Sequence, residues 1–415
     1  MSAELENAVI LGGGVSGKAA LRLCRALGTS AVILNDGEAD ALPPCGLVIA
    51  SPGVHPLRSK LYQLAQASGV PMTSEMCFGF RRLGIPALAI TGTNGKTTTT
   101  ELAGALLASQ GLRAVCCGNI GRPVSDVAAE MIEAGRKLYD AAVIEVSSFQ
   151  LELAEDFSPD AAALLNLASD HEDRYKGGFA EYAAVKRRIF DRMRPENRVY
   201  GLAMPDACTR RVKVADGAVH IDNAPLVKLA ETRLAAPHNA ENLAAALELV
   251  LRLVPAPDVM KLAAAVREFK PGAHRIEAVE VKNGVAFVND SKGTNPAAVL
   301  AAVRSLKGTV VIMLGGLGKG MDFTPLAELA PRLRAAVVFG EARATIGKIM
   351  REAGVPTLDA ECDFTRAFEL AVRSARPGDT VLMSPACASM DMFKNYEERG
   401  NVFRELVKNL TEVKK

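Results

Sequence analysis

The stretch Thr91-Gly92-Thr93-Asn94-Gly95-Lys96-Thr97-Thr98 follows a short apolar run at 87–90 and precedes a segment rich in alanine and leucine. This pattern predicts a buried strand, a tight turn and a helix that begins near Lys96. Glycines let the turn point successive N–H groups at phosphate oxygens, and the helix N-terminus adds partial positive charge. Lys96 can reach the β- and γ-phosphates of a nucleoside triphosphate, and the Thr97 hydroxyl can ligate Mg²⁺. The stretch therefore predicts a phosphate-binding loop.

One position of this loop departs from the common pattern. That pattern places a glycine five residues before Gly95, where this chain has Ile90. The loop is thus a variant, and the alternative interpretation is an ordinary strand–helix turn rich in glycine and threonine. The Gly-Lys-Thr group between a strand and a helix favours phosphate binding.

Strand–helix alternation extends in both directions from this loop. Apolar runs of strand length lie at 8–11, 31–34, 47–50, 87–90, 143–145, 161–167, 285–288, 310–314, 335–339 and 380–383. Such alternation predicts an α/β fold with mainly parallel sheets flanked by helices. A chain of 415 residues is longer than the roughly 250–300 residues of a single core. We therefore expect a Rossmann-like domain at 1–87, a P-loop-type central domain at 88–271 and a Rossmann-like third domain at 272–415.

Composition excludes several classes of function. Apolar residues make up 49% and charged residues 23%, as in ordinary globular proteins, and the net charge of +2 lacks the basic surplus of nucleic-acid-binding proteins. No apolar run reaches the ~20 residues that span a bilayer, and the first seven residues contain no basic side chain. The eight cysteines are scattered, as expected for reduced thiols. We expect a cytoplasmic protein without nucleic-acid partners, membrane insertion or structural zinc.

A second glycine-rich turn lies near the N-terminus. Gly12-Gly13-Gly14-Val15-Ser16-Gly17 follows the first predicted strand, and Asp36 stands at the end of the second. This spacing is typical of dinucleotide-binding turns, in which the acidic residue contacts a ribose. NAD and a nucleotide-linked substrate both fit, so the sequence alone also allows an NAD-dependent oxidoreductase built on residues 1–87.

Polar residues stand at the ends of the central strands, where open α/β sheets bind ligands. Glu145 ends a buried run, in the position where nucleotide hydrolases place a group that binds metal or orients water. His171 and Lys186 are more ambiguous, because a lone histidine is more often a satisfied structural group and a helical lysine is usually solvated.

Three polar loops follow predicted strands of the third domain, at 289–296, 314–320 and 384–391. The first combines a cation, a hydroxyl and amides, and the second contains Lys319 among glycines that permit close backbone approach. The first loop is equally compatible with a helix cap formed by Asn295, followed by Pro296 in the first helical turn.

Taken in order, these motifs resemble the Mur ligase family of cell-wall synthesis. The phosphate loop is similar to that family's signature, including the missing first glycine. The resemblance continues through 118–121, 145–152, 170–171, the segment around Lys186, 238–242 and 274–275. The segments 290–296 and 384–400 are most similar to the branch of the family that adds D-glutamate.

The resemblance implies three domains that hold, in order, a UDP-linked substrate, ATP and an amino acid. It implies ATP-dependent addition of D-glutamate to UDP-N-acetylmuramoyl-L-alanine through an acyl phosphate, by a monomer that uses two Mg²⁺ ions. The glycine-rich turn near the N-terminus would then hold the UDP-linked substrate and not NAD.

The resemblance also implies roles for individual residues. Those expected at ATP are Gly92, Thr93, Asn94, Gly95, Lys96, Thr97, Thr98, Asn239, Asn242, Arg275 and Asp290. Those expected at the UDP-linked substrate are Gly14, Val15, Ser16, Gly17, Asp36, Gly37 and Asn119. Those expected at D-glutamate are Lys292, Thr294, Lys319, Ser389, Met390 and Tyr396. Lys96, Glu145, His171 and Lys186 would be catalytic, and the metal ligands would be Thr97, Glu145, His171 and a carbamate on Lys186.

Two positions depart from the family pattern, and alternatives remain. Leu317 stands where an acidic residue is expected, and Tyr396 stands where the family usually has phenylalanine. Another Mur-type ligase or a folylpolyglutamate-type ligase would share the phosphate loop. An oxidoreductase would leave that loop unexplained, and a non-catalytic nucleotide-binding regulator would not need so many polar strand ends.

Overall fold

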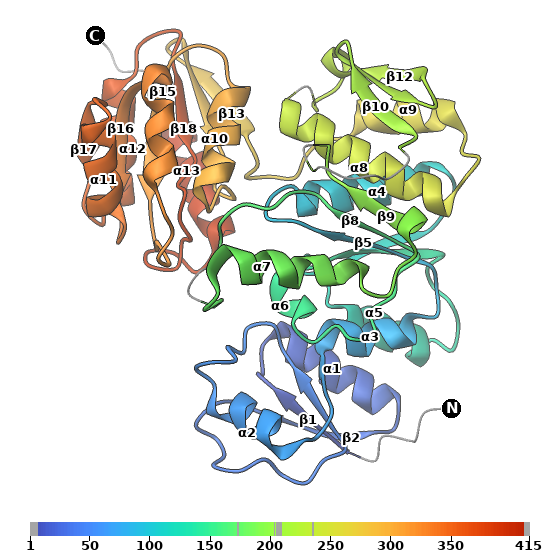
Figure 1. Cartoon of the computed structure of the whole chain (residues 1–415). Coiled ribbons are helices and arrows are strands. Elements are labelled where there is room, and N and C mark those ends of the chain that lie inside the picture. Colours follow the sequence, from blue (N-terminus) through green and yellow to red (C-terminus); the bar gives the residue numbers. More distant parts are fainter. Residues whose placement is uncertain (1–6, 172–173, 203, 205–209, 235, 411–415) are drawn as a thin grey trace. The chain divides into compact units, whose positions relative to one another are not determined.

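The structure is a computed structural model of the chain and describes residues 7–171, 174–202, 204, 210–234 and 236–410. By its contacts the chain divides into two compact units (Figure 1). Unit 1 comprises Met1–Leu167 and Lys176–Phe269, and unit 2 comprises Ala168–Tyr175 and Lys270–Lys415. No helix in the described ranges combines the length and the apolar character that a bilayer crossing requires.

The N-terminal part of unit 1 contains a four-stranded parallel sheet in the order β2-β1-β3-β4. Its elements are β1 (Asn7–Leu11), α1 (Val15–Ala26), β2 (Ser30–Leu34), β3 (Leu47–Ala50), α2 (Lys60–Ser68), β4 (Met72–Ser74) and α3 (Glu75–Leu83). The inner strands β1 and β3 are almost wholly buried, as expected for apolar runs that are covered on both faces.

The central part of unit 1 contains a five-stranded parallel sheet in the order β6-β7-β5-β8-β9. Its strands and helices are β5 (Ala87–Thr91), α4 (Lys96–Ser109), β6 (Ala114–Gly118), α5 (Val124–Glu133), β7 (Ala141–Glu145), α6 (Ser148–Leu151), β8 (Ala161–Leu164), α7 (Gly178–Arg187), β9 (Arg198–Tyr200), α8 (Pro237–Leu253) and α9 (Val259–Glu268). The strands β10 (Val212–Ala215), β11 (Ala218–Ile221) and β12 (Ala224–Lys228) form a small antiparallel sheet beside it.

One hydrophobic core joins the two parts of unit 1. Helices α1 and α3 pack against α5, and the core contains Leu23, Phe78 and Val127 from these three helices. The approach of α3 to α5 is so close that a Cβ on Gly79 would lie 2.4 Å from the Ser125 nitrogen. On the opposite face, α4, α8 and α9 cover the central sheet. The central sheet is thereby buried on both sides.

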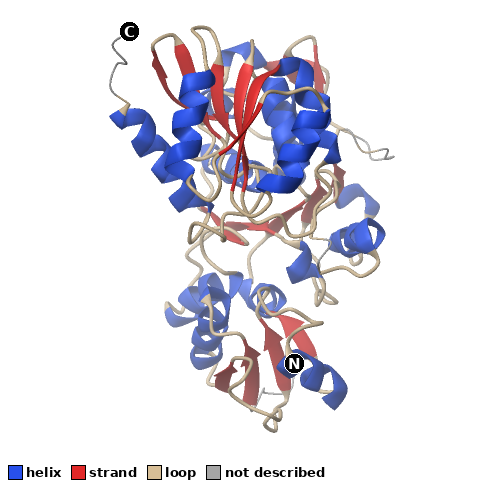
Figure 2. Cartoon of the chain, turned by 90° about the vertical axis from the view of Figure 1, so that its left-hand side faces the viewer, coloured by secondary structure: helices blue, strands red, loops and turns tan. Residues whose placement is uncertain are grey.

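Unit 2 contains a six-stranded sheet in the order β13-β14-β18-β15-β16-β17, parallel except at the edge strand β13 (Figures 1 and 2). Its elements are β13 (Glu277–Lys282), β14 (Val285–Asn289), α10 (Pro296–Ser305), β15 (Val310–Gly315), the 3₁₀ segment η4 (Thr324–Arg332), β16 (Leu333–Phe339), α11 (Arg343–Glu352), β17 (Thr357–Asp359), α12 (Phe364–Ser374), β18 (Thr380–Met383) and α13 (Tyr396–Asn409). One core lies under α10, η4 and α11, and a second lies under α12 and α13 on the other face.

The predicted fold class is confirmed, because the large sheets are mainly parallel and helices flank them. The strand predicted at 161–167 is shorter than expected and ends at Leu164. The three-domain boundaries stay a prediction. By contacts, the first two predicted domains form unit 1, except that residues 168–175 belong to unit 2.

A buried acid lies in the joint between the two parts of unit 1. Glu75 is 1% exposed and accepts a hydrogen bond from the Ser125 N–H at 2.8 Å, while its Oε2 is buried without a hydrogen-bond partner. Burial raises the pKa of Glu75 from 4.5 to about 7. The folded chain therefore keeps this proton over a pH range in which the unfolded chain loses it, so Glu75 costs stability as pH rises through that range.

Replacing Glu75 with glutamine is expected to remove this loss. Between pH 5 and pH 8 the variant should gain stability relative to the parent by up to about 3 kcal/mol, the equivalent of the pKa shift. The measurement is the thermal midpoint of both proteins across this range. Asp290 titrates in a similar range, but it is present in both proteins, so its contribution cancels in the difference between their midpoints. A difference in midpoint that is independent of pH would contradict the prediction.

Candidate active site

The predicted phosphate loop lies between β5 and α4, at the carboxyl end of the central sheet. Gly95 caps α4 with φ +84, and a Cβ there would lie 2.2 Å from the Asn242 Oδ1. Only glycine therefore fits this position. Ile90 is fully buried inside β5 and belongs to the strand. The strand continues through Thr91, which explains why the loop does not need a glycine at position 90.

Lys96 covers this loop with its own side chain. Its Nζ donates hydrogen bonds to the carbonyl oxygens of Gly92 and Thr93, both at 2.9 Å. The first helical hydrogen bond runs from the Thr99 N–H to the Gly95 carbonyl. The preceding N–H groups of α4 have no acceptor within the helix, and such groups bind anions. A cation and a helix N-terminus thus coincide at the loop.

Asn166, two residues after the end of the neighbouring strand β8, holds the loop through hydrogen bonds. Its carbonyl accepts from the Thr93 N–H at 3.0 Å, and its Oδ1 accepts from the Asn94 N–H at 2.9 Å. Its Nδ2 donates to the Asn94 carbonyl at 3.1 Å. Asn166 was not predicted from the sequence. Three peptide groups of the loop are nevertheless fixed by this one residue.

Replacing Asn166 with alanine is expected to raise the KM for ATP by roughly tenfold to thirtyfold, because two hydrogen bonds that order the loop are lost. KM values for the other substrates should change little. Asp160 offers a matched control, since it ties the opposite end of β5 through its Oδ2 and the Ala87 N–H at 2.8 Å. Asp160→Ala should lower the thermal midpoint without raising the KM for ATP. Equal KM values for ATP in both variants would contradict a specific role of Asn166.

Glu145 ends β7 beside the loop strand and is 2% exposed. Its Oε1 accepts a hydrogen bond from the Asn119 Nδ2 at 2.8 Å, and its Oε2 is buried without a hydrogen-bond partner. A carboxylate oxygen of this kind suits a hard cation such as Mg²⁺. Asn119, which is predicted at the UDP-linked substrate, thus orients the predicted metal ligand in this structure.

Lys186 lies on α7 and is buried next to the loop strand. Its Nζ donates to the Thr91 Oγ1 at 3.4 Å and lies 4.9 Å from the centre of the Tyr182 ring. The Tyr182 hydroxyl in turn is 3.1 Å from the Thr93 Oγ1. Tyr182 was not selected from the sequence, yet it connects the predicted metal-binding lysine with the phosphate loop. An ammonium cannot ligate a metal, so this role of Lys186 requires a change of its chemical form.

A pocket opens at the carboxyl end of the N-terminal sheet, with a volume of about 260 Å³. Asp36 lines it, and its Oδ1 accepts hydrogen bonds from the Ser59 hydroxyl and the Leu61 N–H. His55 and Arg58 also line it, although neither was predicted from the sequence. The signal was the Ser51-Pro52-Gly53 turn, which ends β3 and brings the next residues to this edge.

The glycine-rich turn packs helix α1 against this sheet. A Cβ on Gly17 would lie 1.9 Å from the Gly12 carbonyl oxygen, so glycine is required there. Gly14 caps α1, and Val15 is 72% exposed at the helix start. Of the residues predicted for the UDP-linked substrate, Asp36 lines the pocket, whereas Gly14–Gly17, Gly37 and Asn119 do not.

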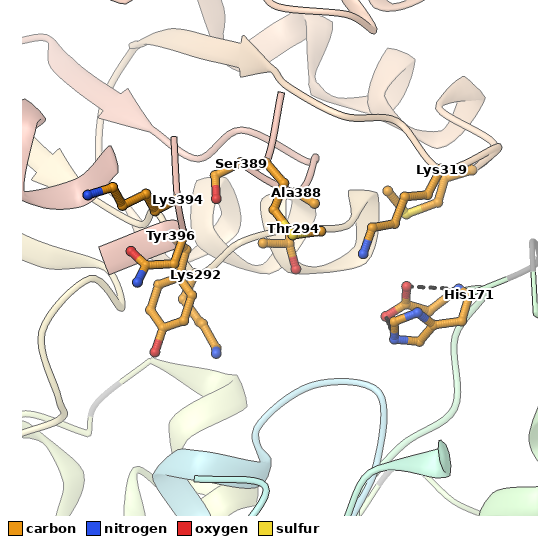
Figure 3. A pocket seen from close by; sticks show the side chains of 12 residues that line it. His171, Lys292, Thr294, Lys319, Ala388, Ser389, Lys394 and Tyr396 are labelled. Carbon is orange, nitrogen blue, oxygen red and sulfur yellow. Dashed lines mark hydrogen bonds and ion pairs between the residues drawn. The ribbon is translucent and has the colours of Figure 1, made fainter. Parts of the chain in front are cut away.

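Another pocket, of about 250 Å³, lies in unit 2 at the carboxyl ends of β14, β15 and β18. Figure 3 shows Lys292 and Tyr396 on one side, Lys319 and His171 on the other, and Thr294 and Ser389 between them. All six residues predicted for D-glutamate line this pocket: Lys292, Thr294, Lys319, Ser389, Met390 and Tyr396. The Lys292 Nζ lies 3.7 Å from the centre of the Tyr396 ring. The volume suits a small polar ligand, being below the roughly 300–1,000 Å³ of pockets for drug-sized molecules.

The segment 168–175 contributes Asp170 and His171 to this pocket. The Asp170 Oδ1 accepts from the His171 N–H at 2.9 Å, and the Asp170 Oδ2 accepts from the Asn295 Nδ2 at 3.4 Å. His171 has φ +56 and Lys319 has φ +49. Such backbone strain in residues other than glycine is concentrated at functional sites.

Asp290, predicted on the ribose and phosphate side of ATP, faces the interior of unit 2. Its Oδ2 accepts from the Ser384 hydroxyl at 2.6 Å, and its Oδ1 accepts from the Ile276 N–H at 3.2 Å. Burial raises the pKa of Asp290 to about 7. In this arrangement Asp290 holds the loops after β14 and β18 together. Its neighbour Arg275 is partly exposed in the same unit.

Comparison with known proteins places these features in a family. Residues 90–221 match the Mur ligase middle domain, and residues 274–387 match the Mur ligase glutamate ligase domain. The chain is 39% identical to the UDP-N-acetylmuramoylalanine–D-glutamate ligase of Aromatoleum aromaticum, over 92% of this chain and 88% of that protein. The chain belongs to the Mur ligase family. It is also 35% identical to the ligase of the same name from Pelotomaculum thermopropionicum, over 98% of both chains.

Solved structures share the Mur ligase fold at lower identity. The UDP-N-acetylmuramate–alanine ligase of Thermotoga maritima matches with a TM-score of 0.61 at 17% identity, over 97% of this chain and 99% of that one. The folylpolyglutamate synthase of Mycobacterium tuberculosis matches with a TM-score of 0.60 at 17% identity, over 78% and 92%. These two similarities concern the fold.

Within this Mur ligase the residues predicted for ATP, metal and D-glutamate are divided between the two units. The residues of the phosphate loop lie at one edge of the central sheet, together with Glu145 and Lys186. Asn242 packs against Gly95, while Asn239 lies one helical turn earlier on α8. Arg275, Asp290, His171 and the pocket residues belong to unit 2. Leu317, the departure from the Mur pattern, forms a backbone bridge with Ala388, a role that does not depend on its side chain.

Proposed function

We propose that this chain is an ATP-dependent ligase that joins D-glutamate to UDP-N-acetylmuramoyl-L-alanine and releases ADP and phosphate, a step of peptidoglycan precursor synthesis. The observation that carries the proposal is the match, over nearly the whole chain, to ligases named for this reaction. Two further observations support it. A phosphate loop and a buried carboxylate stand together in unit 1, and three lysines line a small pocket in unit 2.

The phosphate loop would hold the triphosphate of ATP. Lys96 would exchange its bonds to the Gly92 and Thr93 carbonyls for contacts with phosphate oxygens. The N–H groups at the start of α4 would bind the same oxygens, since they have no acceptor within the helix. The Asn242 side chain packs against Gly95 and would so keep the loop in place under the nucleotide.

The residues present fit Mg²⁺ at this loop. Thr97 and the Glu145 Oε2 offer hard oxygen ligands, and Asn119 fixes the other Glu145 oxygen. We extend the proposal to a second ion held by His171 and by a carbamate that CO₂ forms on Lys186. Bound Mg²⁺ would neutralise phosphate charge during transfer. A crystal structure with metal and substrate bound tests the carbamate, and a bare ammonium at Lys186 would contradict it.

The pocket at Asp36 would hold the UDP part of the acceptor. Asp36 can accept a hydrogen bond from a ribose hydroxyl, in the position that dinucleotide-binding turns use for this purpose. Arg58 on the same wall supplies positive charge for a diphosphate. This assignment replaces NAD with a UDP-linked substrate at the glycine-rich turn.

The pocket of unit 2 would hold D-glutamate. Its two carboxylates require cations and hydroxyl donors on separate walls. Lys319 and Lys292 stand on opposite sides of the pocket, with the Thr294 and Ser389 hydroxyls between them (Figure 3). The Tyr396 ring would close one side, and Met390, which is 60% exposed, would cover the entrance.

The reaction needs two displacements. An oxygen of the alanyl carboxylate attacks the γ-phosphorus of ATP, the bond from phosphorus to the bridging oxygen of ADP breaks, and an acyl phosphate forms. The amine of D-glutamate then attacks the acyl carbon, the bond to phosphate breaks, and the nitrogen loses a proton. The chain contributes positioning and charge neutralisation to both steps, which is the main requirement of phosphoryl transfer.

We place the enzyme in the cytoplasm, as a monomer. Eight scattered cysteines are ordinary for a protein in a reducing compartment. Each described pocket is lined by residues of one unit of one chain, so no second copy is required to complete it. Light scattering at working concentration tests the monomer, and a dimer would contradict it.

The decisive experiment is ADP release by the purified chain with Mg²⁺, ATP, UDP-N-acetylmuramoyl-L-alanine and single amino acids. Release is expected with D-glutamate and should be far slower with L-glutamate, L-lysine or D-alanine. No release with D-glutamate would overturn the proposal. Release with a folate and L-glutamate instead would favour a folylpolyglutamate-type ligase.

A further inference from the structure

Three loops of unit 2, together with Asp170 and His171, line the pocket that the proposed function assigns to D-glutamate. They follow adjacent strands of the sheet: the β14 loop (290–295), the β18 loop (384–395) and the β15 loop (316–323). The first carries Lys292 and Thr294, the second Ser389, and the third Lys319. Because the two carboxylates of the amino acid would contact different loops, the spacing of these loops decides which amino acid fits.

Arg399 lies below this pocket and joins the loops. It is on the first turn of α13, has no exposed surface and does not line the pocket. Its Nε donates to the Ser291 Oγ at 3.0 Å, and its Nη2 donates to the Ser291 carbonyl at 2.8 Å and to the Cys387 carbonyl at 3.1 Å. One guanidinium thus fixes the backbone of the β14 loop to that of the β18 loop.

The third loop reaches the same guanidinium. A Cβ on Gly316 would lie 3.2 Å from the Arg399 Nη1 and 2.3 Å from the Ala388 carbonyl oxygen. Leu317 and Ala388 pair through two backbone hydrogen bonds, which hold the β15 loop against the β18 loop. Ser291 also donates through its hydroxyl to the Tyr396 carbonyl at 2.8 Å. Each of the three loops is therefore within one or two contacts of Arg399.

Stability alone does not account for this residue. Its Nη1 is buried without a hydrogen-bond partner, and burial lowers the pKa of Arg399 to about 10, so it remains charged at neutral pH. Apolar side chains of similar volume are often at least as stabilising as a buried charge. What an apolar side chain cannot supply is a planar fork of donors that fixes two loops in one geometry.

We propose that Arg399 is a positioning residue that sets the amino-acid selectivity of this pocket by fixing the distance between the β14 and β18 loops. Lys292 and Thr294 stand on one of these loops and Ser389 on the other. Ser291, one residue before Lys292, is the contact through which Arg399 acts. The proposal rests on the proposed function of the pocket, and it concerns no direct contact with the substrate.

The test compares Arg399→Lys, Arg399→Met and Ser291→Ala with the parent. Each variant is expected to raise the KM for D-glutamate at least about tenfold, because small displacements of binding groups have large effects. The KM values for ATP and for UDP-N-acetylmuramoyl-L-alanine should stay within about twofold. The preference for D-glutamate over D-aspartate, which is one methylene shorter, should fall. Ser291→Ala keeps the buried charge of Arg399 and removes only the hydroxyl that accepts from its Nε. This variant therefore tests the positioning role if the Arg399 variants do not fold.

Arg334 provides the matched control. It forms a two-bond ion pair with Asp379 at the opposite, amino-terminal end of the same sheet, with an Nη2–Oδ1 distance of 2.9 Å. Arg334→Met should lower the thermal midpoint and leave the D-glutamate preference unchanged. Equal losses for all substrates in the Arg399 and Ser291 variants would overturn the proposal, as would an unchanged preference. A parent enzyme that does not use D-glutamate would instead refute the proposed function.

Discussion

Replacing Lys96 with methionine is expected to lower kcat/KM for ATP by about a thousandfold or more, because a positive charge aimed at a transferring phosphoryl group contributes this much. Methionine keeps most of the length of the side chain and removes the charge. The folded loop should survive, since Asn166 holds it through three hydrogen bonds that do not involve Lys96. The measurement is ADP release at several ATP concentrations.

Two observations would separate this effect from unfolding. The thermal midpoint of Lys96→Met should stay within a few degrees of the parent, and the binding of UDP-N-acetylmuramoyl-L-alanine should be unchanged. Lys96→Arg keeps the charge but not the compact ammonium, and we expect intermediate activity. A loss smaller than tenfold in Lys96→Met would contradict the assignment of the loop to ATP phosphates.

The phosphate loop could be predicted from sequence because its elements are local. Strand, turn and helix follow one another within about twenty residues, and each has its own pattern. The same holds for Gly17, whose requirement for glycine comes from a carbonyl only five residues away. The fold class followed from the same alternation of short apolar runs and helices.

Residues that act across the sheet could not be predicted in this way. Asn166 contacts Asn94 because β5 and β8 are neighbours, and Tyr182 reaches Thr93 from α7. Strand order is not contained in periodicity. One signal was nevertheless available for Asn166, since it is the first polar residue after the apolar residues 161–165, and Glu145 was selected because it ends such a run.

Arg399 shows the opposite case, in which the local pattern is misleading. It follows Glu397 and Glu398 in a helical segment, and such a charged run indicates a solvated helix face. The structure instead buries it completely under three loops. The neighbouring acids occupy the first turn of α13, where negative charge stabilises the helix N-terminus.

Replacing Lys319 with alanine is expected to raise the KM for D-glutamate about a hundredfold, because removing the partner of a bound carboxylate costs a few kcal/mol. The KM for ATP should change little. Lys394 is the matched control: it lines the same pocket but is exposed, and Figure 3 shows it pointing away from Lys319. Lys394→Ala should leave the KM for D-glutamate within about threefold of the parent.

A third variant separates charge from backbone strain at this position. Lys319 holds φ +49, which costs an L-residue roughly 1 kcal/mol and glycine almost nothing. Lys319→Gly should therefore be more stable than Lys319→Ala while its KM for D-glutamate stays just as high. If glycine restored the KM, the strained backbone and not the ammonium would be what the substrate requires. An equal rise in the KM for ATP would refute the assignment of Lys319 to the amino acid, since the phosphate loop that we assign to ATP belongs to the other unit.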